Sequence, residues 1–524
     1  MLENPFDVPH PTPRSPRRAR PRLAWIPWVL IATVFVGTPL VGQESPTSVD
    51  QRLSALIEAL GSSDPEVHRR FFEQHCVPGD RPMEQRVGTL GRIVGLTGGL
   101  DVHRVSERSD DRLVALAQQR SDQRWVRLLL DHESEAPFRV VSFGLELTSP
   151  PLDAVAGAPL DLEGLKTELA ELVGSRVADG SFSGAVRVSH GTTLLFEGAA
   201  GLAERRFGVA NQLDTRFNLG SVNKSFTAVA IGQLVDRGLV DFDDRLVDLV
   251  PGLPRPERLS DITLAHLLSH RSGLGSYWQQ LFATNFGNIR SHRQLVDLAI
   301  DQDPDFDAGS RFQYSNLGYV LLGRVIEEVS GLDYFEYMRR HVFAPAGMND
   351  TDSWAADDPV AGLATGYTRQ TDGTDHGVGP WRSNLFLHSA QGCAAGGGYS
   401  TVGDLHRFVV ALWGDRLVEP ETRARLHHEV AGLGDARGYG LGFGIRGEGP
   451  LRNIGHNGGA PGISADYRHY PELGVTVAVL ANIDGGARQL PTEVEALLAR
   501  WRSGAATARG SAPERSETAA QPRG

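Results

Sequence analysis

Lysine is almost absent from this chain of 524 residues. Of its 52 basic residues only Lys166 and Lys224 are lysine, and arginine carries nearly all the remaining positive charge. Arginine is effectively never deprotonated, whereas a desolvated lysine can become a neutral amine and accept a proton. A lysine retained in so arginine-biased a sequence is therefore a candidate for chemistry that arginine cannot perform. Lys166 falls on an exposed Glu/Lys face of an expected helix, which indicates an ordinary surface residue.

Cysteine is equally scarce. The two cysteines, Cys76 and Cys393, lie far apart, so the sequence offers no disulfide framework and no thiolate metal site, and we expect two unpaired thiols. The sequence also lacks H-E-x-x-H or a comparable metal-binding pattern, and it lacks the G-x-S-x-G motif of the α/β-hydrolases. We therefore expect neither a metal ion nor a cofactor.

An excess of positive charge is lacking too. The formal net charge is −12, although the first 22 residues carry a net +3 because five arginines outweigh Glu3 and Asp7. The rest of the chain is therefore near −15, and it contains no basic stripe. Nucleic acid and anionic membrane surfaces are poor partners for such a body. A small-molecule or peptide substrate is the expected partner, and the sequence leaves the oligomeric state open.

The N-terminus has the pattern of an export signal. Arginines up to Arg22 precede an uncharged stretch from Leu23 to Gln43, with an apolar centre from Trp25 to Val36. Residues 1–43 are therefore expected to be a signal peptide, with a cleavage point after Gly42, or an uncleaved membrane anchor, since about 20 uncharged residues can span a bilayer. Either alternative places the active part outside the cytoplasm, in the periplasm, outside the cell or anchored to a membrane.

Two folded parts are expected after this segment. Residues 48–148 combine helical periodicity up to Cys76 with later strand-like runs, which predicts a small α+β domain whose order and length resemble the cone-shaped nuclear-transport-factor-2-like fold. Residues 149–160 are rich in proline and predict a linker. Residues 161–502 carry hairpins at both ends with helical segments between them, which predicts one antiparallel sheet assembled from both ends of the domain. Residues 503–524 lack apolar residues and are expected to be a disordered tail.

A candidate nucleophile stands next to the second lysine. Ser221 and Lys224 open an expected helix whose apolar residues, Phe226, Val229, Leu234 and Val235, face the core. Residues three apart share a helical face, so the hydroxyl and the amine can meet. A serine hydroxyl is a weak nucleophile that needs an adjacent base, and the backbone N–H of Ser221 at a helix start can stabilise developing negative charge.

At this point the sequence resembles the serine β-lactamase and penicillin-binding-protein superfamily, whose first motif is S-x-x-K. Tyr314-Ser315-Asn316 looks like the Y-x-N motif of the class C-type enzymes and their esterase relatives, and His456-Asn457-Gly458 resembles the H-x-G variant of the third motif. Further stretches match the same superfamily, among them Leu267–Leu274, Phe343–Thr351, Ala395–Thr401 and Tyr439–Phe443. The resemblance covers roughly residues 165–500.

The resemblance implies a fold and a site. The fold would be α+β, an antiparallel sheet with flanking helices and an all-helical lobe. Ser221, Lys224 and Tyr314 would be catalytic, and the backbone N–H groups of Ser221 and Gly459 would form the oxyanion hole. Asn316, His456, Asn457 and Gly458 would contact the substrate. Whether Lys224 or Tyr314 is the base stays open.

The expected activity is acyl transfer through a Ser221 acyl-enzyme, on an ester or an amide. His456 and Asn457 replace a lysine and a hydroxyl residue that favour the carboxylate of a β-lactam or a D-alanyl terminus. An esterase-like or D-amino-acid peptidase-like enzyme is therefore expected. A β-lactamase or D,D-carboxypeptidase is the first alternative, and a non-catalytic binding or sensor protein of the same fold is the second.

Overall fold

The computed structural model describes residues 49–79, 81–121, 125–148, 157–277, 286–355, 357–369, 380–433 and 437–510. The chain divides into two compact units, Met1–Thr148 and Ser149–Gly524, and each has its own hydrophobic core. The predicted export segment 1–43, residues 149–156 of the predicted linker and residues 511–524 of the predicted tail lie outside the described residues. Among the helices that are described, none is both long enough and apolar enough to cross a membrane.

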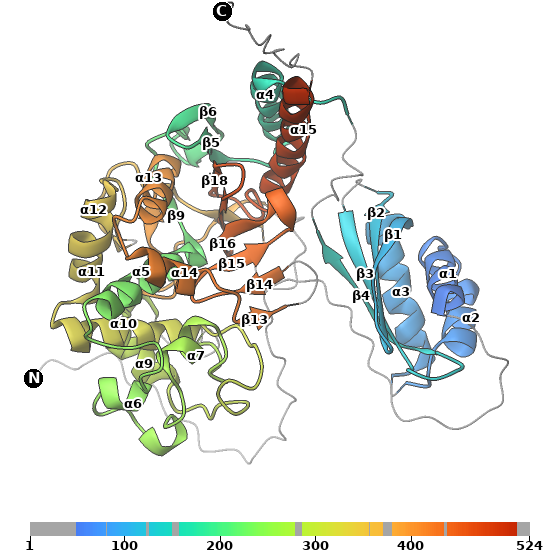
Figure 1. Cartoon of the computed structure of the whole chain (residues 1–524), viewed down its shortest axis with the longest axis horizontal. Helices are drawn as coiled ribbons and strands as arrows, with labels where there is room; N and C mark the ends of the chain where they lie inside the picture. Colours follow the sequence, from blue (N-terminus) through green and yellow to red (C-terminus); the bar gives the residue numbers. More distant parts are fainter. Residues whose placement is uncertain are drawn as a thin grey trace, which may run out of the picture. The chain divides into compact units, whose positions relative to one another are not determined.

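The first unit has helices followed by a meander of strands (Figure 1). A four-stranded antiparallel sheet runs in the order β1-β2-β3-β4, and its buried residues share one core with the helices. Asp64 caps the second helix by accepting the N–H of Glu66 at 2.9 Å. The elements are α1 (Val49–Leu60), α2 (Pro65–His75), α3 (Met83–Thr97), β1 (Leu100–Arg108), β2 (Arg112–Gln119), β3 (Trp125–His132) and β4 (Val140–Leu147).

The sequence did not predict two elements of this unit, α3 and β1. The helix α3 contains Gly88, Gly91 and Gly95, and each glycine weakens a helix by about 1 kcal/mol relative to alanine, so packing rather than propensity maintains it. The strand β1 is exposed along most of its length and therefore lacks an apolar alternation. The resemblance to a nuclear-transport-factor-2-like cone stays a prediction.

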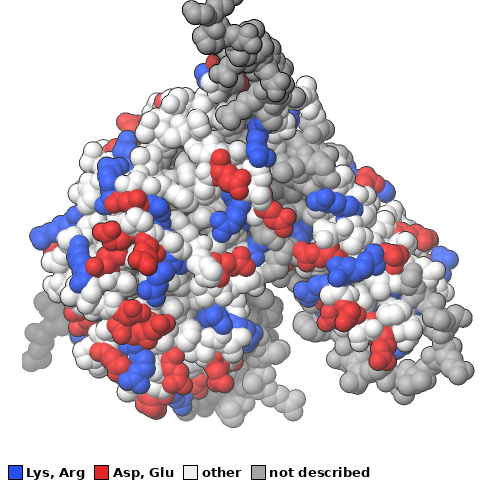
Figure 2. All heavy atoms as spheres, viewed as in Figure 1, with Lys and Arg blue, Asp and Glu red and all other residues white. Residues whose placement is uncertain are grey.

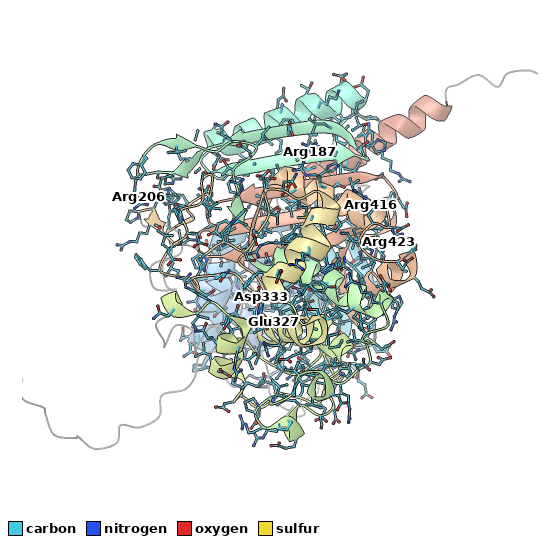
Figure 3. The ribbon with its side chains drawn as sticks, turned by 90° about the vertical axis from the view of Figure 1, so that its left-hand side faces the viewer. Arg187, Arg206, Glu327, Asp333, Arg416 and Arg423 are labelled. Carbon is cyan, nitrogen blue, oxygen red and sulfur yellow. The ribbon has the colours of Figure 1, made fainter. Side chains whose placement is uncertain are left out.

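The second unit is built on an eight-stranded antiparallel sheet in the order β13-β14-β15-β16-β17-β18-β5-β6. Val477 of β18 lies opposite Val188 of β5, so the expected pairing of strands from the two ends of the domain is confirmed. Arg187 of β5, labelled in Figure 3, forms an ion pair with Glu197 of β6. The strands are β5 (Gly184–His190), β6 (Thr193–Ala200), β13 (Ala431–Gly432), β14 (Arg437–Tyr439), β15 (Gly444–Arg446), β16 (Asn453–Ala460), β17 (Ile463–Tyr470) and β18 (Val475–Ala481).

One face of this sheet is covered by α4 (Leu162–Ala178) and α15 (Leu490–Gly510), which lie side by side (Figure 1). Their apolar residues share a core with the valines of β5 and β18. Lys166 of α4 is exposed and pairs with Glu163 at 2.8 Å, as expected of a surface lysine. The helix α15 continues to Gly510, so the prediction of a disordered tail is wrong for residues 503–510, where the alanine-rich sequence favours a helix.

The other face carries a helical lobe around α5 (Asn223–Asp236) and α13 (Val402–Trp413). Phe226 and Val229 of α5 are fully buried, as predicted, and Phe226 packs edge-on against Phe408 of α13. Among the described residues, further helices are α6 (Leu246–Leu249), α7 (Leu264–Leu268), α9 (His292–Ala299), α10 (Asn316–Ser330), α11 (Tyr334–Tyr337), α12 (Ala344–Ala346) and α14 (Pro420–Leu426), with a π-helical stretch, Met338–Phe343, between α11 and α12.

Short antiparallel ribbons complete this unit: β7 (Leu202–Glu204) with β8 (Val209–Ala210), β9 (Phe217–Asn218) with β12 (Tyr399–Ser400), and β10 (Tyr367–Thr368) with β11 (Arg382–Ser383). On the face shown in Figure 2, acidic and basic side chains of the described residues are interspersed. That face therefore carries no broad basic area of the kind that nucleic acid requires.

Candidate active site

The candidate nucleophile sits in a tight turn between β9 and α5. Gly220 has φ +49°, in the left-handed region that favours glycine, and its N–H donates to the Asn218 side chain at 2.9 Å. A 3-10 turn, Gly220–Val222, then leads into α5. Ser221 is half-buried and stands at the start of this helix.

Lys224 lies one helical turn further and is completely buried. Its Nζ contacts three oxygens: the Ser221 hydroxyl at 3.1 Å, the Asn316 side-chain carbonyl at 2.9 Å and the backbone carbonyl of Ala395. Burial lowers the pKa of Lys224 to about 7, against a smaller opposing effect of Cys393. The predicted meeting of hydroxyl and amine is therefore present, and near neutral pH much of the amine is uncharged.

The three contacts orient the uncharged amine. A neutral amine offers two N–H groups and one lone pair, and the Asn316 and Ala395 carbonyl oxygens can only accept hydrogen bonds. These two oxygens therefore take the two N–H groups. The lone pair is left for the hydroxyl of Ser221, and Lys224 stands as the hydrogen-bond acceptor of the pair.

Tyr314 and Asn316 flank the start of α10. Ser315 caps this helix, accepting the Gly318 N–H at 2.9 Å, which fixes the residues on either side of it. The Lys224 Nζ lies 4.9 Å from the Tyr314 ring centre. Burial raises the pKa of Tyr314, although its hydrogen bond with Ser221 acts in the opposite direction, so the phenol keeps its proton at neutral pH.

Two glycines of β16 approach the nucleophile turn from the other side. A Cβ on Gly458 would lie 1.9 Å from the Leu219 carbonyl oxygen and 2.8 Å from the Ser221 nitrogen, so only glycine fits. A Cβ on Gly220 would lie 3.0 Å from the Gly459 nitrogen. Hydrogen bonds alternate along an antiparallel pair, and Ala460 closes the two-residue hairpin to β17, so the Gly459 N–H points away from β17. The backbone N–H groups of Ser221 and Gly459 therefore lie close together.

His456 lies deeper in the same strand. It is buried, its Nε2 is 2.8 Å from the Tyr439 hydroxyl and its Nδ1 is 2.6 Å from the Asn457 carbonyl oxygen. A carbonyl only accepts, so Nδ1 carries the proton and Nε2 accepts from Tyr439. Burial, followed by the charge of Lys224, lowers the pKa of His456 to about 3, so this residue is neutral at physiological pH.

The structure does not bring the Asn457 side chain to Ser221. Side chains alternate along β16, and Asn457 lies on the face opposite to His456 and Gly458. It is exposed, and its Oδ1 accepts a hydrogen bond from Arg446. Contact of Asn457 with a substrate stays a prediction.

Two of the four further stretches that match the superfamily, Leu267–Leu274 and Ala395–Thr401, contribute to the site although the sequence assigned them no role. His270, from the first, is buried; its ring centre lies 4.1 Å from that of Tyr314, and its Nδ1 accepts the Ser315 N–H at 3.0 Å. The second, beginning at Ala395, supplies the backbone carbonyl under Lys224. The match of both segments to the superfamily indicated that they belong to the site. A sequence motif does not show which of its atoms contacts Lys224.

Cys393 and Cys76 are both buried free thiols. Cys393 Sγ lies 3.6 Å from the Tyr277 hydroxyl. Within the described ranges, no group of three or more His, Cys, Asp or Glu side chains could hold a metal ion.

Comparison with known proteins identifies the family. The protein-family profile described as Beta-lactamase matches residues 169–500, more than half of the chain. The chain belongs to the Beta-lactamase family. It is therefore a serine hydrolase of the group that includes β-lactamases and penicillin-binding proteins, and the predicted α+β fold with its antiparallel sheet is confirmed.

Relatives within the Beta-lactamase family bear different names. Penicillin-binding protein 4* of Bacillus subtilis (strain 168) is 28% identical over 313 residues, which are 57% of this chain and 68% of that protein. Esterase EstB of Burkholderia gladioli is 30% identical over 331 residues, which are 57% of this chain and 83% of EstB. The crystal structure of a penicillin binding protein from Bacillus halodurans superimposes with a TM-score of 0.58 at 31% identity, covering 63% of this chain and 98% of that chain.

Proposed function

We propose that this chain is an exported serine hydrolase that cleaves an ester or amide through an acyl-enzyme on Ser221. The observation that carries the proposal is the buried Lys224 amine, 3.1 Å from the Ser221 hydroxyl and with a pKa lowered to about 7 by burial. A fully charged lysine could not accept a proton, and a distant one could not reach it. Export rests on the arginine-rich and apolar pattern of residues 1–43.

In the first step the Ser221 oxygen attacks the substrate carbonyl carbon while the Lys224 lone pair takes the hydroxyl proton. A new C–O bond forms, and the carbonyl π electrons move to the oxygen. The backbone N–H groups of Ser221 and Gly459 would hold this oxyanion, and the start of α5 adds the favourable end of a helix dipole. The closeness of these two amides supports their pairing as an oxyanion hole.

Collapse of this intermediate breaks the bond to the leaving group. Tyr314 is suited to donate the proton that the leaving alcohol or amine requires, because burial keeps its phenol protonated. The phenolate regains a proton from the Lys224 ammonium. A water molecule then attacks the acyl-enzyme by the same route in reverse, releasing the acid and restoring Ser221.

We infer that neutral acyl esters are preferred over β-lactams and D-alanyl termini. His456 stands where the resemblance places a cationic lysine, and its low pKa leaves it uncharged. A neutral imidazole that already accepts from Tyr439 offers little to a substrate carboxylate. The name of the relative Esterase EstB agrees with this preference, whereas the name penicillin-binding protein 4* favours the first alternative, a β-lactamase or D,D-carboxypeptidase.

A fluorophosphonate probe tests the nucleophile. We expect covalent labelling of the wild-type chain, loss of labelling in Ser221→Ala, and retained labelling in Ser225→Ala. Ser225 is a matched control because it lies on the same helix, but its hydroxyl donates to the Gly442 carbonyl at 3.1 Å. Equal labelling of Ser221→Ala would show that another residue is the nucleophile, and an unlabelled wild type would favour the binding or sensor protein.

A substrate panel tests the preference. Short-chain p-nitrophenyl esters, a chromogenic cephalosporin and D-amino-acid p-nitroanilides are compared by kcat/KM. We expect the esters to be cleaved fastest. A higher kcat/KM for the cephalosporin would reverse the substrate assignment while leaving the nucleophile assignment intact.

A further inference from the structure

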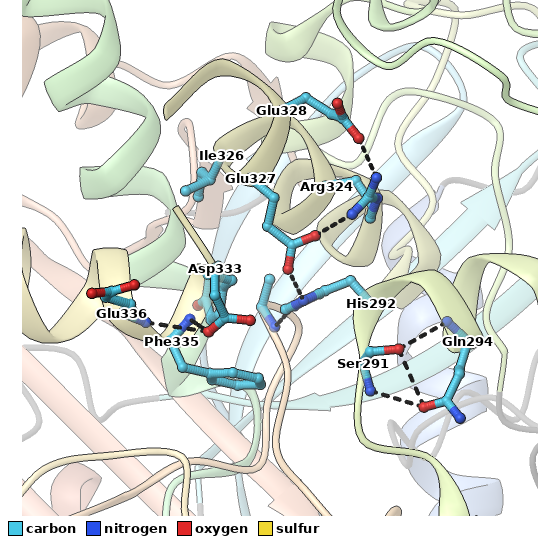
Figure 4. Close-up of polar contacts among 12 residues, drawn as sticks. Ser291, His292, Gln294, Arg324, Ile326, Glu327, Glu328, Asp333, Phe335 and Glu336 are labelled. Carbon is cyan, nitrogen blue, oxygen red and sulfur yellow. Dashed lines mark hydrogen bonds and ion pairs between the residues drawn. The ribbon is translucent and has the colours of Figure 1, made fainter. Parts of the chain in front are cut away.

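His292, at the start of α9, forms a buried relay of hydrogen bonds close to the site but outside it. Its side chain has no exposed surface, its Nδ1 lies 3.2 Å from the Glu327 carboxylate, and its Nε2 lies 2.9 Å from the Ala394 backbone nitrogen. A backbone N–H only donates, so Nε2 is the acceptor and Nδ1 donates its proton to Glu327. Figure 4 shows the contact with Glu327 between α9 and α10.

The surroundings of His292 hold it in one position. Gly323 of α10 lies directly beneath it: a Cβ there would be 2.5 Å from the imidazole ring and 2.9 Å from the Ala394 Cβ. Only glycine lets both groups pass so close to the helix. On another side the ring packs against Tyr334, with 4.6 Å between ring centres.

Glu327 is fixed in turn. It accepts from Arg324, one helical turn earlier on α10, and the two residues are drawn together in Figure 4. Burial raises the pKa of Glu327, but the hydrogen bonds from His292 and Arg324 and the charge of Arg324 lower it by more, so the pKa lies below its usual value and the carboxylate stays ionised. Figure 3 places Glu327 in the helical part of this unit, near Asp333. An ionised acceptor strengthens the bond from His292.

His292 and Lys224 bind two consecutive residues, Ala394 and Ala395. Ala394 donates its N–H to His292, and the following residue, Ala395, accepts from the Lys224 amine through its carbonyl oxygen. The turn is closed by two hydrogen bonds between Cys393 and Gly396, at 2.7 and 3.0 Å. It is therefore a small rigid unit, and His292 anchors it to α9 and α10.

We infer that His292 is a positioning residue for the acyl-transfer chemistry. It holds the Ala395 carbonyl on one N–H of Lys224, and this leaves the amine lone pair directed at Ser221. The inference rests on the proposed role of Lys224 as the base. Without the hydrogen bond from Ala394 to His292, the Ala395 carbonyl shifts away from the Lys224 amine. An N–H of the amine can then turn toward Ser221 in place of the lone pair, and the amine no longer accepts the serine proton.

The test uses the scarcity of lysine. The full chain is labelled with [ε-¹³C]lysine, so only Lys166 and Lys224 are observed by NMR. In His292→Phe we expect the ε-carbon signal of Lys224 to shift and its titration midpoint to change, while the signal of exposed Lys166 stays in place. We expect kcat for p-nitrophenyl ester cleavage to fall by about 10- to 100-fold with KM within about two-fold, as for a misplaced catalytic group.

Three further variants separate positioning from loss of packing. His292→Gln keeps an acceptor for the Ala394 N–H and should recover most of the activity. Glu327→Gln keeps an oxygen acceptor for Nδ1 without the charge and should show a smaller loss. His406→Gln is the matched control, because His406 is also a buried histidine with an Nε2 contact, to Gly191 on the sheet side. We expect it to leave the Lys224 signal unchanged.

The outcomes are distinguishable. An unchanged Lys224 signal in both His292→Phe and Glu327→Gln would overturn the positioning role. In a second outcome, the wild-type chain neither cleaves esters nor reacts with a fluorophosphonate, while His292→Phe still shifts the Lys224 signal. That result would support the structural link between His292 and Lys224 and reject the proposed hydrolase. If His292→Phe does not fold, Glu327→Gln decides, and equal effects of Glu327→Gln and His406→Gln on kcat would also overturn the inference.

Discussion

The Lys224 amine lies 3.1 Å from the Ser221 hydroxyl, on a side chain with no exposed surface. A charged ammonium is costly in such a place, since burial removes its water. The same burial lowers the pKa of Lys224 to about 7 and makes the amine a usable base. Burial of Lys224 therefore lowers the free energy of unfolding, and the proposed chemistry requires the same burial.

Replacing Lys224 by arginine should strongly reduce turnover. A guanidinium keeps its proton under all working conditions, so it cannot accept one from Ser221 even though its charge is the same. We expect Lys224→Arg to lower kcat/KM for ester cleavage by about 10²- to 10⁴-fold, the usual contribution of general base catalysis. Lys166→Arg is the matched control, because Lys166 is exposed and pairs with Glu163 at the surface. Equal losses in both variants would show that the amine of Lys224 has no special part.

The acylation rate should rise with pH through about 7. The active form of Lys224 is the neutral amine, so the rate increases as the proton is lost and levels off once the amine is fully neutral. Stopped-flow measurement of the p-nitrophenol burst between pH 5 and 9 gives this profile. A rate that falls over the same interval would mean that the ammonium is the active form.

Replacing Lys224 by methionine should stabilise the fold, and the gain should depend on pH. The pKa of Lys224 is lowered from 10.5 to about 7 in the folded state, so the unfolded chain binds the extra proton between these values. The cost to stability is therefore complete below pH 7, fades as pH rises, and vanishes above 10.5. At 1.36 kcal/mol per pKa unit it is at most ~5 kcal/mol.

The measurement is Tm between pH 6 and 10. Lys224→Met should melt higher than wild type at pH 6, and the two curves should converge toward pH 10. Lys166→Met serves as control, because its side chain is 38% exposed and should show no such trend. A difference in Tm that does not change with pH would contradict the lowered pKa.

The two glycines of β16 should respond differently to alanine. Gly458→Ala forces a Cβ into the Leu219 carbonyl and should displace the nucleophile turn, with a loss of stability of ~1–3 kcal/mol and of most activity. Gly459→Ala meets only the Ile463 carbonyl oxygen at 3.9 Å and keeps its backbone N–H, so it should fold normally. Urea denaturation and ester cleavage check both. Equal tolerance of the two changes would refute the close approach of β16 to Ser221.

Local features of the second unit followed from the sequence. The hairpins from 184 to 200 and from 463 to 481, and the apolar face of α5, depend on alternation and on helical periodicity, which residues close in the chain determine. In the first unit α3 and β1 were not predicted, since glycines and exposed polar residues conceal their pattern. Nothing local could have revealed that α3 is maintained by packing.

Part of the site is also local, and the rest is not. Ser221 and Lys224 meet because they are three positions apart at the start of a helix, so the sequence by itself determines their contact. The low pKa of Lys224 depends on its complete burial, and its orientation depends on Asn316, ninety-two positions away, and on Ala395, which is further still. Only the packed tertiary structure decides which distant oxygens surround a buried amine, and which face of β16 carries His456 and which carries Asn457.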